Sequence, residues 1–373
     1  MTFHLLYLQI FFLFVNKLKS SSAQSVPALF VFGDSLVDVG NNNYLTFTIA
    51  KSDLPNHGVD FPTHKPNGRF SNGKIAADFL AEKLGLQSPL PYLYLVHTKT
   101  NEFSRGVSFA SAAAGILNST NRCLDLPLID GLDDEISHFT IPMDEQVEYY
   151  IKTRGILVEN LGESRAAKLL SESVFTIVIG STDIGTYFYS RCASVTERRS
   201  PQQFIDIIVI TMKRHLKRIY DHGGRKFVIL GIGPIGCTPS ARVNTKNEAC
   251  DEVSNYWASK YNQALLLVLR DLISEFQDFI YSYINIYDLF LNIVEQADSY
   301  GFKDKKTACC GLGRLNADEA CYPISSLCPD RSDHVFWDLY HPTEAFTRII
   351  VEAAFDGPQH YAFPVNVRQL VST

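Results

Sequence analysis

Short runs of β-branched and aromatic residues recur along this chain, and longer segments with helical spacing of hydrophobic positions separate them. The runs occupy residues 28–32, 107–110, 174–179, 227–230 and 279–284. Most of them are continuously hydrophobic instead of alternating between hydrophobic and polar, which is typical of strands covered on both faces. We therefore predict five strands of a mainly parallel sheet.

The segment that follows Ser200 carries the clearest helical pattern. Ser200 is a suitable N-cap, Pro201 fits the first helical position, and Gln203 can complete a reciprocal capping pair. Hydrophobic residues then recur at three- and four-residue steps until Gly223, a residue type that commonly ends helices. The positions concerned are Phe204, Ile207, Ile208, Met212, Leu216 and Ile219. We predict a helix over this segment.

Further helices separate the other strands. A hydrophobic stripe within 75–84 ends at Gly85, a long helix is predicted over 252–276, and a last one follows Thr343. Alternation of strands and helices implies a parallel sheet with helices on both faces. The pattern predicts an α/β fold, a three-layer α/β/α sandwich, in which residues 24–373 form a single domain.

The N-terminus has the pattern of a secretory signal peptide. Residues 5–15 are hydrophobic but too few to span a bilayer comfortably, and small residues follow them up to Ala23. Lys17 and Lys19 follow the hydrophobic run instead of preceding it, and a membrane anchor or a buried strand is the alternative interpretation. We predict a signal peptide over 1–23, a protein secreted to the cell wall or the extracellular fluid, with the vacuole as the alternative destination, and no stable membrane anchor.

Charge and cysteine content agree with an extracellular protein. The formal net charge of −6 argues against binding to nucleic acids or to anionic lipid. Four of the eight cysteines (Cys309, Cys310, Cys321 and Cys328) lie in one loop-rich segment, and Cys237 and Cys250 bracket another loop. Zinc-ligand spacing is absent, so disulfides are favoured, with their pairing left open. Asn118 begins a glycosylation sequon.

Candidate chemistry begins where the first predicted strand ends, at Gly33-Asp34-Ser35. Ligands of open parallel sheets bind beyond the carboxyl ends of the strands. Gly33 permits a tight turn there, which would expose the Ser35 hydroxyl and leave its backbone N–H free to donate. A serine after a strand is more often only a helix cap, so this signal needs a partner.

That partner lies near the other end of the chain. Asp338 and His341 are three residues apart, so the carboxylate can accept from one imidazole nitrogen while the other faces a serine. Pro342 and a helix start follow His341, which places the histidine in a loop. A surface histidine beside a capping residue is the alternative interpretation of this pair alone.

In combination the two elements resemble the GDSL-type esterases and lipases of plants, within the SGNH hydrolase superfamily. The resemblance covers nearly the whole predicted mature chain and rests on the order and spacing of six blocks, at residues 32–43, 67–73, 106–117, 179–183, 233–237 and 338–341. It implies a flavodoxin-like sheet and ester hydrolysis, with Ser35, Asp338 and His341 in the positions of the family's triad.

The same resemblance assigns an oxyanion hole to the Ser35 N–H, a glycine N–H in the third block and an Asn side chain in the fourth. This sequence departs from it, because Thr182 occupies the Asn position and Ala113 the glycine position, with Gly115 the nearest glycine. Alanine keeps its N–H, whereas a threonine hydroxyl reaches less far than an amide and can turn to a backbone carbonyl. An active but slow enzyme is therefore expected.

Four loop residues of these blocks, Asp34, Asp38, Asn41 and Arg69, are better interpreted as scaffolding than as catalysts. The spacing Gly-x-Gly-x-x-Gly at 231–236 resembles a dinucleotide site, but Pro234 argues against the helix start that such a site requires. We expect no metal or organic cofactor.

Three functions remain open on this basis. A serine esterase or lipase acting through an acyl-enzyme is favoured, with a small-molecule or lipid ester as its substrate. A transacylase or carbohydrate acetylesterase would use the same triad. A lipid- or glycan-binding protein on a decayed hydrolase fold is the third, suggested by Thr182.

Overall fold

The computed structural model describes residues 25–121, 139–189 and 199–373. The predicted signal peptide, Cys123 and Cys192 lie outside the described residues.

A seven-stranded sheet forms the centre of the molecule, in the order β11-β6-β5-β4-β1-β3-β2. Its strands are β1 (Leu29–Gly33), β2 (Leu90–Pro91), β3 (Val107–Ser108), β4 (Val174–Val178), β5 (Lys226–Leu230), β6 (Ile280–Ile284) and β11 (Ala362–Pro364). Every pairing is parallel except that of β11 with β6. The predicted mainly parallel sheet is confirmed.

The predicted count of five strands is too low. All five predicted strands are present, and their order is second, first, third, fourth, fifth, which is that of flavodoxin. The two additional strands, β2 and β11, lie at the edges and have two and three residues. Each contains a proline, a residue that interrupts a strand pattern and is tolerated at sheet edges.

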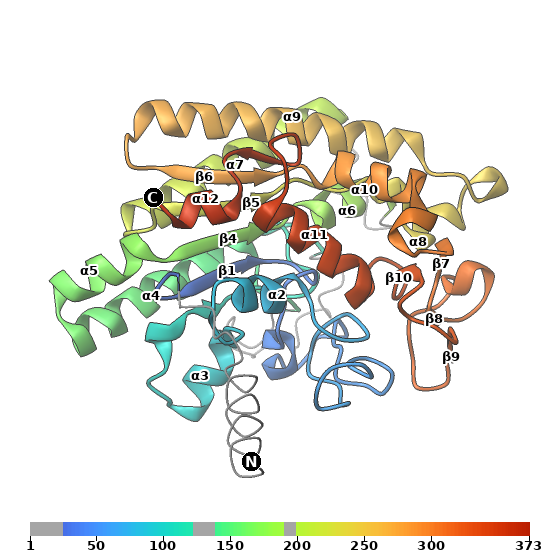
Figure 1. Cartoon of the computed structure of the whole chain (residues 1–373), viewed down its shortest axis with the longest axis horizontal. Helices are drawn as coiled ribbons and strands as arrows, with labels where there is room; N and C mark the ends of the chain where they lie inside the picture. Colours follow the sequence, from blue (N-terminus) through green and yellow to red (C-terminus); the bar gives the residue numbers. More distant parts are fainter. Residues whose placement is uncertain (1–24, 122–138, 190–198) are drawn as a thin grey trace, which may run out of the picture.

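Helices cover both faces of this sheet (Figure 1). On one face lie α3 (Tyr92–Thr98), α4 (Met143–Leu161), α5 (Glu163–Glu172), α6 (Ser181–Tyr189), α7 (Pro201–Asp221) and α9 (Glu252–Glu275). On the other lie α2 (Ala76–Lys83), α11 (Glu344–Asp356) and α12 (Val367–Val371). Phe30 and Phe32 belong to the first core and Leu29 and Val31 to the second, so the continuous hydrophobicity of β1 serves both layers.

The longer helices were predicted correctly from their sequence patterns. The predicted reciprocal cap of α7 is present: Gln203 N donates to Ser200 Oγ over 3.3 Å, and Ser200 N donates to Gln203 Oε1 over 3.0 Å. A helix follows Thr343 as predicted, and the Thr343 side chain caps it by accepting from Phe346 N. The helix after Thr343 is not the last, however, because the five-residue α12 follows it and is too short to show a period.

Beyond the layered core, the chain forms a small lobe of short elements near its C-terminal end. It comprises α8 (Pro239–Arg242), α10 (Ile286–Glu295), β7 (Asp304–Ala308), β8 (Cys310–Gly311), β9 (Ser326–Leu327) and β10 (His334–Phe336). The strands β10 and β7 pair in parallel and β8 and β9 pair antiparallel.

Disulfides hold this lobe together. They join three pairs of cysteines that are close in the chain, Cys237–Cys250, Cys309–Cys328 and Cys310–Cys321. Two of the three bridges lie in the cysteine-rich segment that the sequence singled out. For these six cysteines the disulfide interpretation is confirmed over the zinc one.

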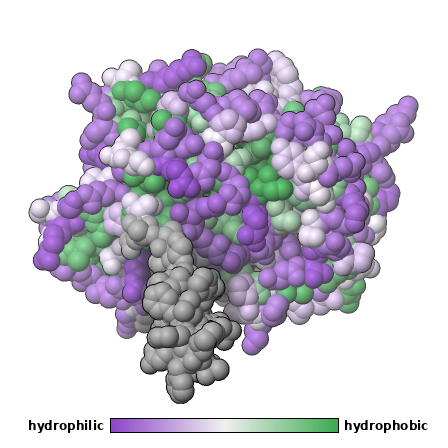
Figure 2. Space-filling model, viewed as in Figure 1, coloured by the Kyte–Doolittle hydropathy of each residue, from purple (hydrophilic) through white to green (hydrophobic). Residues whose placement is uncertain are grey.

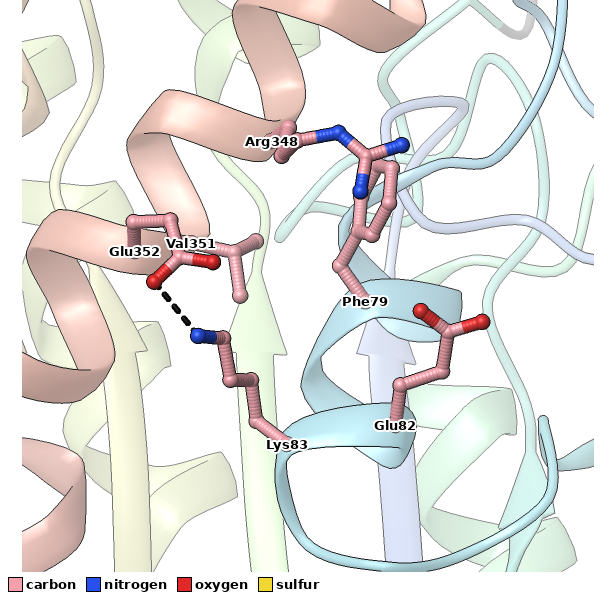
Figure 3. Close-up of a pocket in the computed structure, with 6 residues that line it drawn as sticks. All are labelled: Phe79, Glu82, Lys83, Arg348, Val351 and Glu352. Atoms are coloured by element: carbon pink, nitrogen blue, oxygen red, sulfur yellow. Dashed lines mark hydrogen bonds and ion pairs between the residues drawn. The ribbon is translucent and has the colours of Figure 1, made fainter. Parts of the chain in front are cut away.

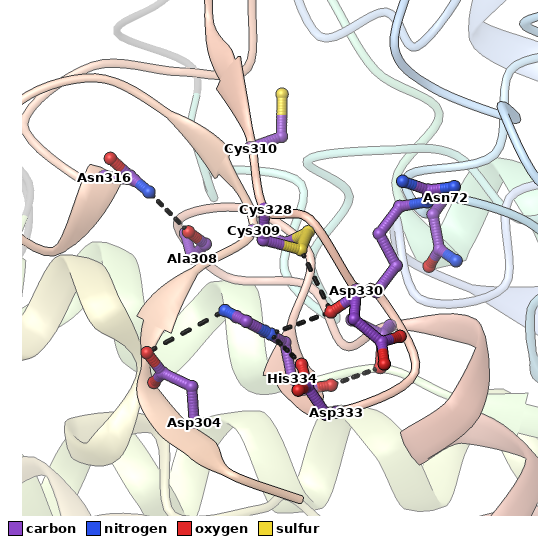
Figure 4. Close-up of a disulfide and its surroundings, with 12 residues drawn as sticks. Asn72, Asp304, Ala308, Cys309, Cys310, Asn316, Cys328, Asp330, Asp333 and His334 are labelled. Atoms are coloured by element: carbon purple, nitrogen blue, oxygen red, sulfur yellow. Dashed lines mark hydrogen bonds and ion pairs between the residues drawn. A yellow bond between two sulfur atoms is a disulfide. The ribbon is translucent and has the colours of Figure 1, made fainter.

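The Cys309–Cys328 bridge lies beside a loop rich in charged side chains (Figure 4). At the end of this loop His334, the first residue of β10, contacts the Asp330 carbonyl oxygen at 3.0 Å and the Asp333 carboxylate at 2.7 Å through its Nδ1. Its Nε2 lies 3.8 Å from Asp304 Oδ2 on the neighbouring strand β7. The histidine therefore ties the loop to the small parallel pair of strands.

The surface of the face seen in Figure 1 is covered mainly by hydrophilic side chains, with hydrophobic ones in separate small areas (Figure 2). Within the described part of the chain, none of the helices combines the length and hydrophobicity needed to cross a membrane.

Candidate active site

The predicted site residues gather where β1, β3 and β4 end. Ser35 follows β1, Ala113 lies in the loop after β3, and Thr182 lies in the first turn of α6, directly after β4. Because these strands are parallel, their carboxyl ends meet at one edge of the sheet. Gly33 is needed there, since a Cβ atom would lie 2.3 Å from the Val178 carbonyl oxygen.

Ser35, His341 and Asp338 form one hydrogen-bonded chain. Ser35 Oγ lies 2.7 Å from His341 Nε2, and His341 Nδ1 lies 2.7 and 2.8 Å from the two oxygens of Asp338. The histidine and the aspartate are buried and the serine is half-buried. This is the nucleophile–base–acid arrangement that serine hydrolases use.

Backbone N–H groups hold the Asp338 carboxylate in place and favour its ionised form. Its Oδ1 also accepts from the backbone N–H groups of Tyr340 and His341, each over 2.9 Å. Burial favours the neutral acid, but the charge and hydrogen bond of His341, together with these N–H groups, outweigh burial and hold the pKa of Asp338 below its usual value. The three-residue spacing therefore gives both the contact and an ionised carboxylate.

Contacts between the second sequence block and α11 fix the position of His341. Asn72 Oδ1 accepts from the first backbone N–H of α11, that of Glu344, over 2.8 Å. In return, Lys74 N donates to Glu344 Oε2 over 3.1 Å. The Phe70 ring lies against the His341 imidazole, with centroids 4.9 Å apart. The two ends of the chain are thus joined beside the base.

Among the described residues, no acceptor is found for the backbone N–H groups of four predicted site residues, Ser35, Ala113, Gly115 and Thr182. Ala113 has a φ angle of 65°, in the left-handed region that favours glycine. An alanine there is consistent with its assignment to the family's glycine position. The N–H groups of these four residues are available to an external acceptor.

The Thr182 side chain has a different partner from the one expected. Its Oγ1 lies 3.4 Å from Asp34 Oδ2, so the hydroxyl faces a carboxylate and not a backbone carbonyl. Ser181 Oγ donates to the same oxygen over 2.8 Å. Burial raises the pKa of Asp34. Hydrogen bonds from the Leu36 N–H and from these two hydroxyl groups partly offset that increase.

Gly115 is buried and packs closely against Thr120 and Asp183. A Cβ atom there would lie 2.4 Å from Thr120 and 2.6 Å from the Asp183 carboxylate. Asp183 accepts from Ile116 N, Leu117 N and Thr120 Oγ1, and burial raises its pKa to about 6. Asn118, the sequon asparagine, is exposed on the same loop.

The scaffolding interpretation of the other loop residues agrees with their contacts. Asp38 Oδ1 accepts from Gly40 N and Asn41 N, and its Oδ2 accepts from Ala112 N. Asn41 Nδ2 donates to the carbonyl of Ser108, the last residue of β3, and to that of Ala110. Arg69 forms a bidentate pair with Asp78 at 2.8 Å.

Two buried side chains beside the site escaped the sequence analysis. Gln146 of α4 bonds both backbone groups of Gly33, each over 2.8 Å, and thereby holds the turn before Ser35. His57 lies with its Nε2 4.0 Å from Asp338 Oδ2. Neither residue lies in an element or motif that the sequence analysis predicted, and a loop histidine carries no distinguishing pattern.

The segment with Gly-x-Gly-x-x-Gly spacing does not form a dinucleotide site. After β5, residues 231–234 are not helical, and the next elements are a single 3₁₀ turn at Ile235–Cys237 and the four-residue α8, so the segment lacks the helix that a dinucleotide site needs. Among the described residues, no group of His, Cys, Asp and Glu side chains has the arrangement of a metal site.

A shallow hollow between α2 and α11 is separate from the predicted site residues (Figure 3). Phe79 and Val351 give it apolar walls, and Lys83 forms an ion pair with Glu352 across it. Its other two charged residues pair with side chains outside the lining, Glu82 with Lys74 and Arg348 with Glu344. Charges that are paired in this way are typical of a solvated helix–helix surface.

Comparison with known proteins defines the class. Residues 29–354 match the family model of the GDSL-like lipases and acylhydrolases. Together with the parallel α/β sheet, this match identifies a carboxylic ester hydrolase, and the chain belongs to the GDSL lipase/acylhydrolase family.

The similarity to individual proteins supports the same family membership. Three GDSL esterases/lipases of Arabidopsis thaliana are 43%, 39% and 37% identical to it. The alignments cover 98%, 97% and 96% of this chain and 98%, 97% and 94% of the relatives. The similarity therefore extends over the whole length of these proteins.

Proposed function

We propose that the protein is a secreted serine esterase or lipase that hydrolyses carboxylic esters through an acyl-enzyme formed on Ser35. The observation that carries the proposal is the continuous contact from Ser35 Oγ through His341 to Asp338, at 2.7 Å on each side of the imidazole. Small-molecule and lipid esters are the substrate class.

In the first half-reaction His341 Nε2 accepts the Ser35 proton as Oγ attacks the ester carbonyl. Asp338 stabilises the imidazolium and holds the ring with Nε2 toward the serine. His341 then gives the proton to the departing alcohol. In the second half-reaction water attacks the acyl-serine, again with His341 as the base, and the carboxylic acid leaves.

The unengaged N–H groups of Ser35 and Ala113 are the donors we assign to the tetrahedral oxyanion. Thr182 is the third member of this set and contributes less, because its hydroxyl faces Asp34. Gly115 supports the loop by close packing against Thr120 and Asp183.

Hydrolysis of a short and a long nitrophenyl ester by the secreted protein tests the proposal, with Ser35→Ala as the inactive variant. Ser299→Ala, which changes an exposed serine, is the matched control. Activity is expected in the wild type and the control and absent from Ser35→Ala. Equal rates in wild type and Ser35→Ala would exclude the mechanism.

A second measurement separates hydrolysis from acyl transfer and tests secretion. Product analysis with an added alcohol distinguishes free acid from a new ester. Mass spectrometry of the exported protein is expected to show an N-terminus after Ala23 and a glycan on Asn118.

A further inference from the structure

His57 is a buried histidine that the two-step mechanism does not use. Its side chain is 6% exposed and its Nε2 lies 4.0 Å from Asp338 Oδ2. Phe70 and Trp337 enclose the ring, each with its centroid 6.0 Å away. Phe70 also lies against His341, so one aromatic ring contacts both histidines.

The hydrogen bonding of Asp338 is unequal between its two oxygens. Oδ1 accepts from Tyr340 N, His341 N and His341 Nδ1, whereas Oδ2 shares only the His341 Nδ1 proton. A buried carboxylate oxygen gains from a further donor. His57, whose Nε2 lies 4.0 Å from Oδ2, is placed to supply one.

The proton of His57 belongs on the nitrogen that faces this carboxylate. Burial lowers the pKa of His57 and keeps the ring neutral, while the charge of Asp338 opposes that effect only in part. His341 and Asp53 are the other titratable groups that act on it. The Leu54 backbone also acts on the ring, but His57 Nδ1 has no hydrogen-bond partner of normal geometry. The charged acceptor at Nε2 therefore determines where the single proton resides.

From this arrangement we infer that His57 is a positioning residue, whose neutral imidazole directs Nε2–H toward Asp338 Oδ2 and so fixes the carboxylate for His341. A separation of 4.0 Å is longer than a hydrogen bond, and such contacts at catalytic sites often shorten only when substrate is bound. The inference rests on the mechanism proposed above.

Removal of the donor has two consequences. The Oδ2 atom of Asp338 loses its second donor and is held less firmly toward His341, so kcat falls by roughly 10-fold, the lower range for a hydrogen bond to a charged group. More negative potential remains beside His341, so the acidic limb of the kcat/KM profile moves upward by about half a pH unit. KM changes little, because His57 does not touch the substrate.

The test compares His57→Phe, which keeps a ring between Phe70 and Trp337, with His57→Gln, whose amide can still donate. His57→Phe is expected to show both effects and His57→Gln to restore kcat to within about threefold of the wild type. His360→Gln, which changes an exposed histidine, is the control. Wild-type kcat and pH profile in His57→Phe would overturn the inference, as would equal losses in both variants without a shift of the acidic limb.

A readout without turnover keeps this test separate from that of the proposed function. The low-field NMR resonance of the proton between His341 Nδ1 and Asp338 is expected to move in His57→Phe and to return toward its wild-type position in His57→Gln. An unmoved resonance in both would overturn the inference even in an active enzyme. Absence of ester hydrolysis in the wild type would instead exclude the proposed function.

Discussion

The Thr182 hydroxyl lies 3.4 Å from the Asp34 carboxylate. A side chain that faces a carboxylate directs its proton there and not toward a substrate oxygen. We therefore expect Thr182, at the position where the resemblance implies an amide donor, to contribute little to an oxyanion hole through its side chain.

Thr182→Asn is accordingly expected to raise turnover. Loss of one oxyanion donor costs about 10²–10³ in kcat, and recovery of part of that gives an increase of roughly 10-fold or more. Steady-state hydrolysis of nitrophenyl esters measures it. Thr182→Val is the control and should change kcat little, and a Thr182→Asn variant no faster than the wild type would contradict the prediction.

Ala113 and Gly115 are expected to respond to substitution in opposite ways. Ala113→Gly relieves the left-handed strain at φ 65° and should leave stability unchanged or increased by up to about 1 kcal/mol. Ala167→Gly, at an exposed helical position, should instead cost about 1 kcal/mol. Thermal unfolding compares the two variants, and a larger loss in Ala113→Gly would show that the methyl group is needed.

Gly115→Ala is expected to damage the same loop. The new Cβ atom would lie 2.4 Å from Thr120, so the segment that carries the Ala113 N–H must shift. We expect a fall in kcat of at least roughly 10-fold, since small displacements of oxyanion donors weaken catalysis strongly. Nitrophenyl ester hydrolysis checks this, and near-wild-type kcat in a folded variant would argue against placing the oxyanion hole at this loop.

His215 is expected to make the fold sensitive to acid. It is fully buried, with Nδ1 3.8 Å from Asp144 Oδ1 and Nε2 3.4 Å from the Ile116 carbonyl oxygen. Burial lowers its pKa to about 4, against 6.5 for an ordinary histidine, with Asp144 opposing and Arg214 and Arg218 reinforcing the shift. The unfolded chain therefore binds a proton between pH 6.5 and about 4 that the folded protein does not.

Because the unfolded chain binds this proton more readily, the free energy of unfolding decreases as the pH falls. The stability associated with neutral His215 is fully present above pH 6.5 and is lost as the pH falls toward about 4, to a limit of about 3 kcal/mol. His215→Gln removes this titration. Urea unfolding at pH 7 and pH 4.5 should show a smaller pH dependence in the variant, and identical pH dependence would contradict the burial argument.

The Cys310–Cys321 bridge is expected to support catalysis as well as stability. Cys310 N donates to the Trp337 carbonyl over 2.7 Å, directly before Asp338. Replacement of both cysteines by serine should cost about 2–4 kcal/mol and lower kcat. Thermal unfolding gives the first quantity, and kcat per titrated active site gives the second. Unchanged kcat per site would confine the bridge to a stabilising role.

Much of the fold was legible in sequence because buried parallel strands are continuously hydrophobic and long helices show their period and caps. β2 and β11 were missed, since strands of two or three residues that contain proline carry no period. The contact of Ser35 with His341 was anticipated from motif order. The orientation of the Thr182 hydroxyl was not, because a choice between two nearby acceptors depends on the tertiary positions of both.

His57 and Gln146 illustrate the same limit. In the sequence neither Gln146 nor His57 differs from other residues of its type. Only the fold places Gln146 of α4 beside Gly33 of β1 and His57 beside Asp338. Their partners are distant in the chain, so no local pattern could reveal them.

Ser35 and His341 are 306 residues apart along the chain. A ribosome therefore makes most of the polypeptide between Ser35 and His341. Nascent chains and fragments that end anywhere between the two residues lack the proposed nucleophile–base pair. Two separately produced fragments should regain activity only on reassociation, which makes the pair a sensitive reporter of complete folding.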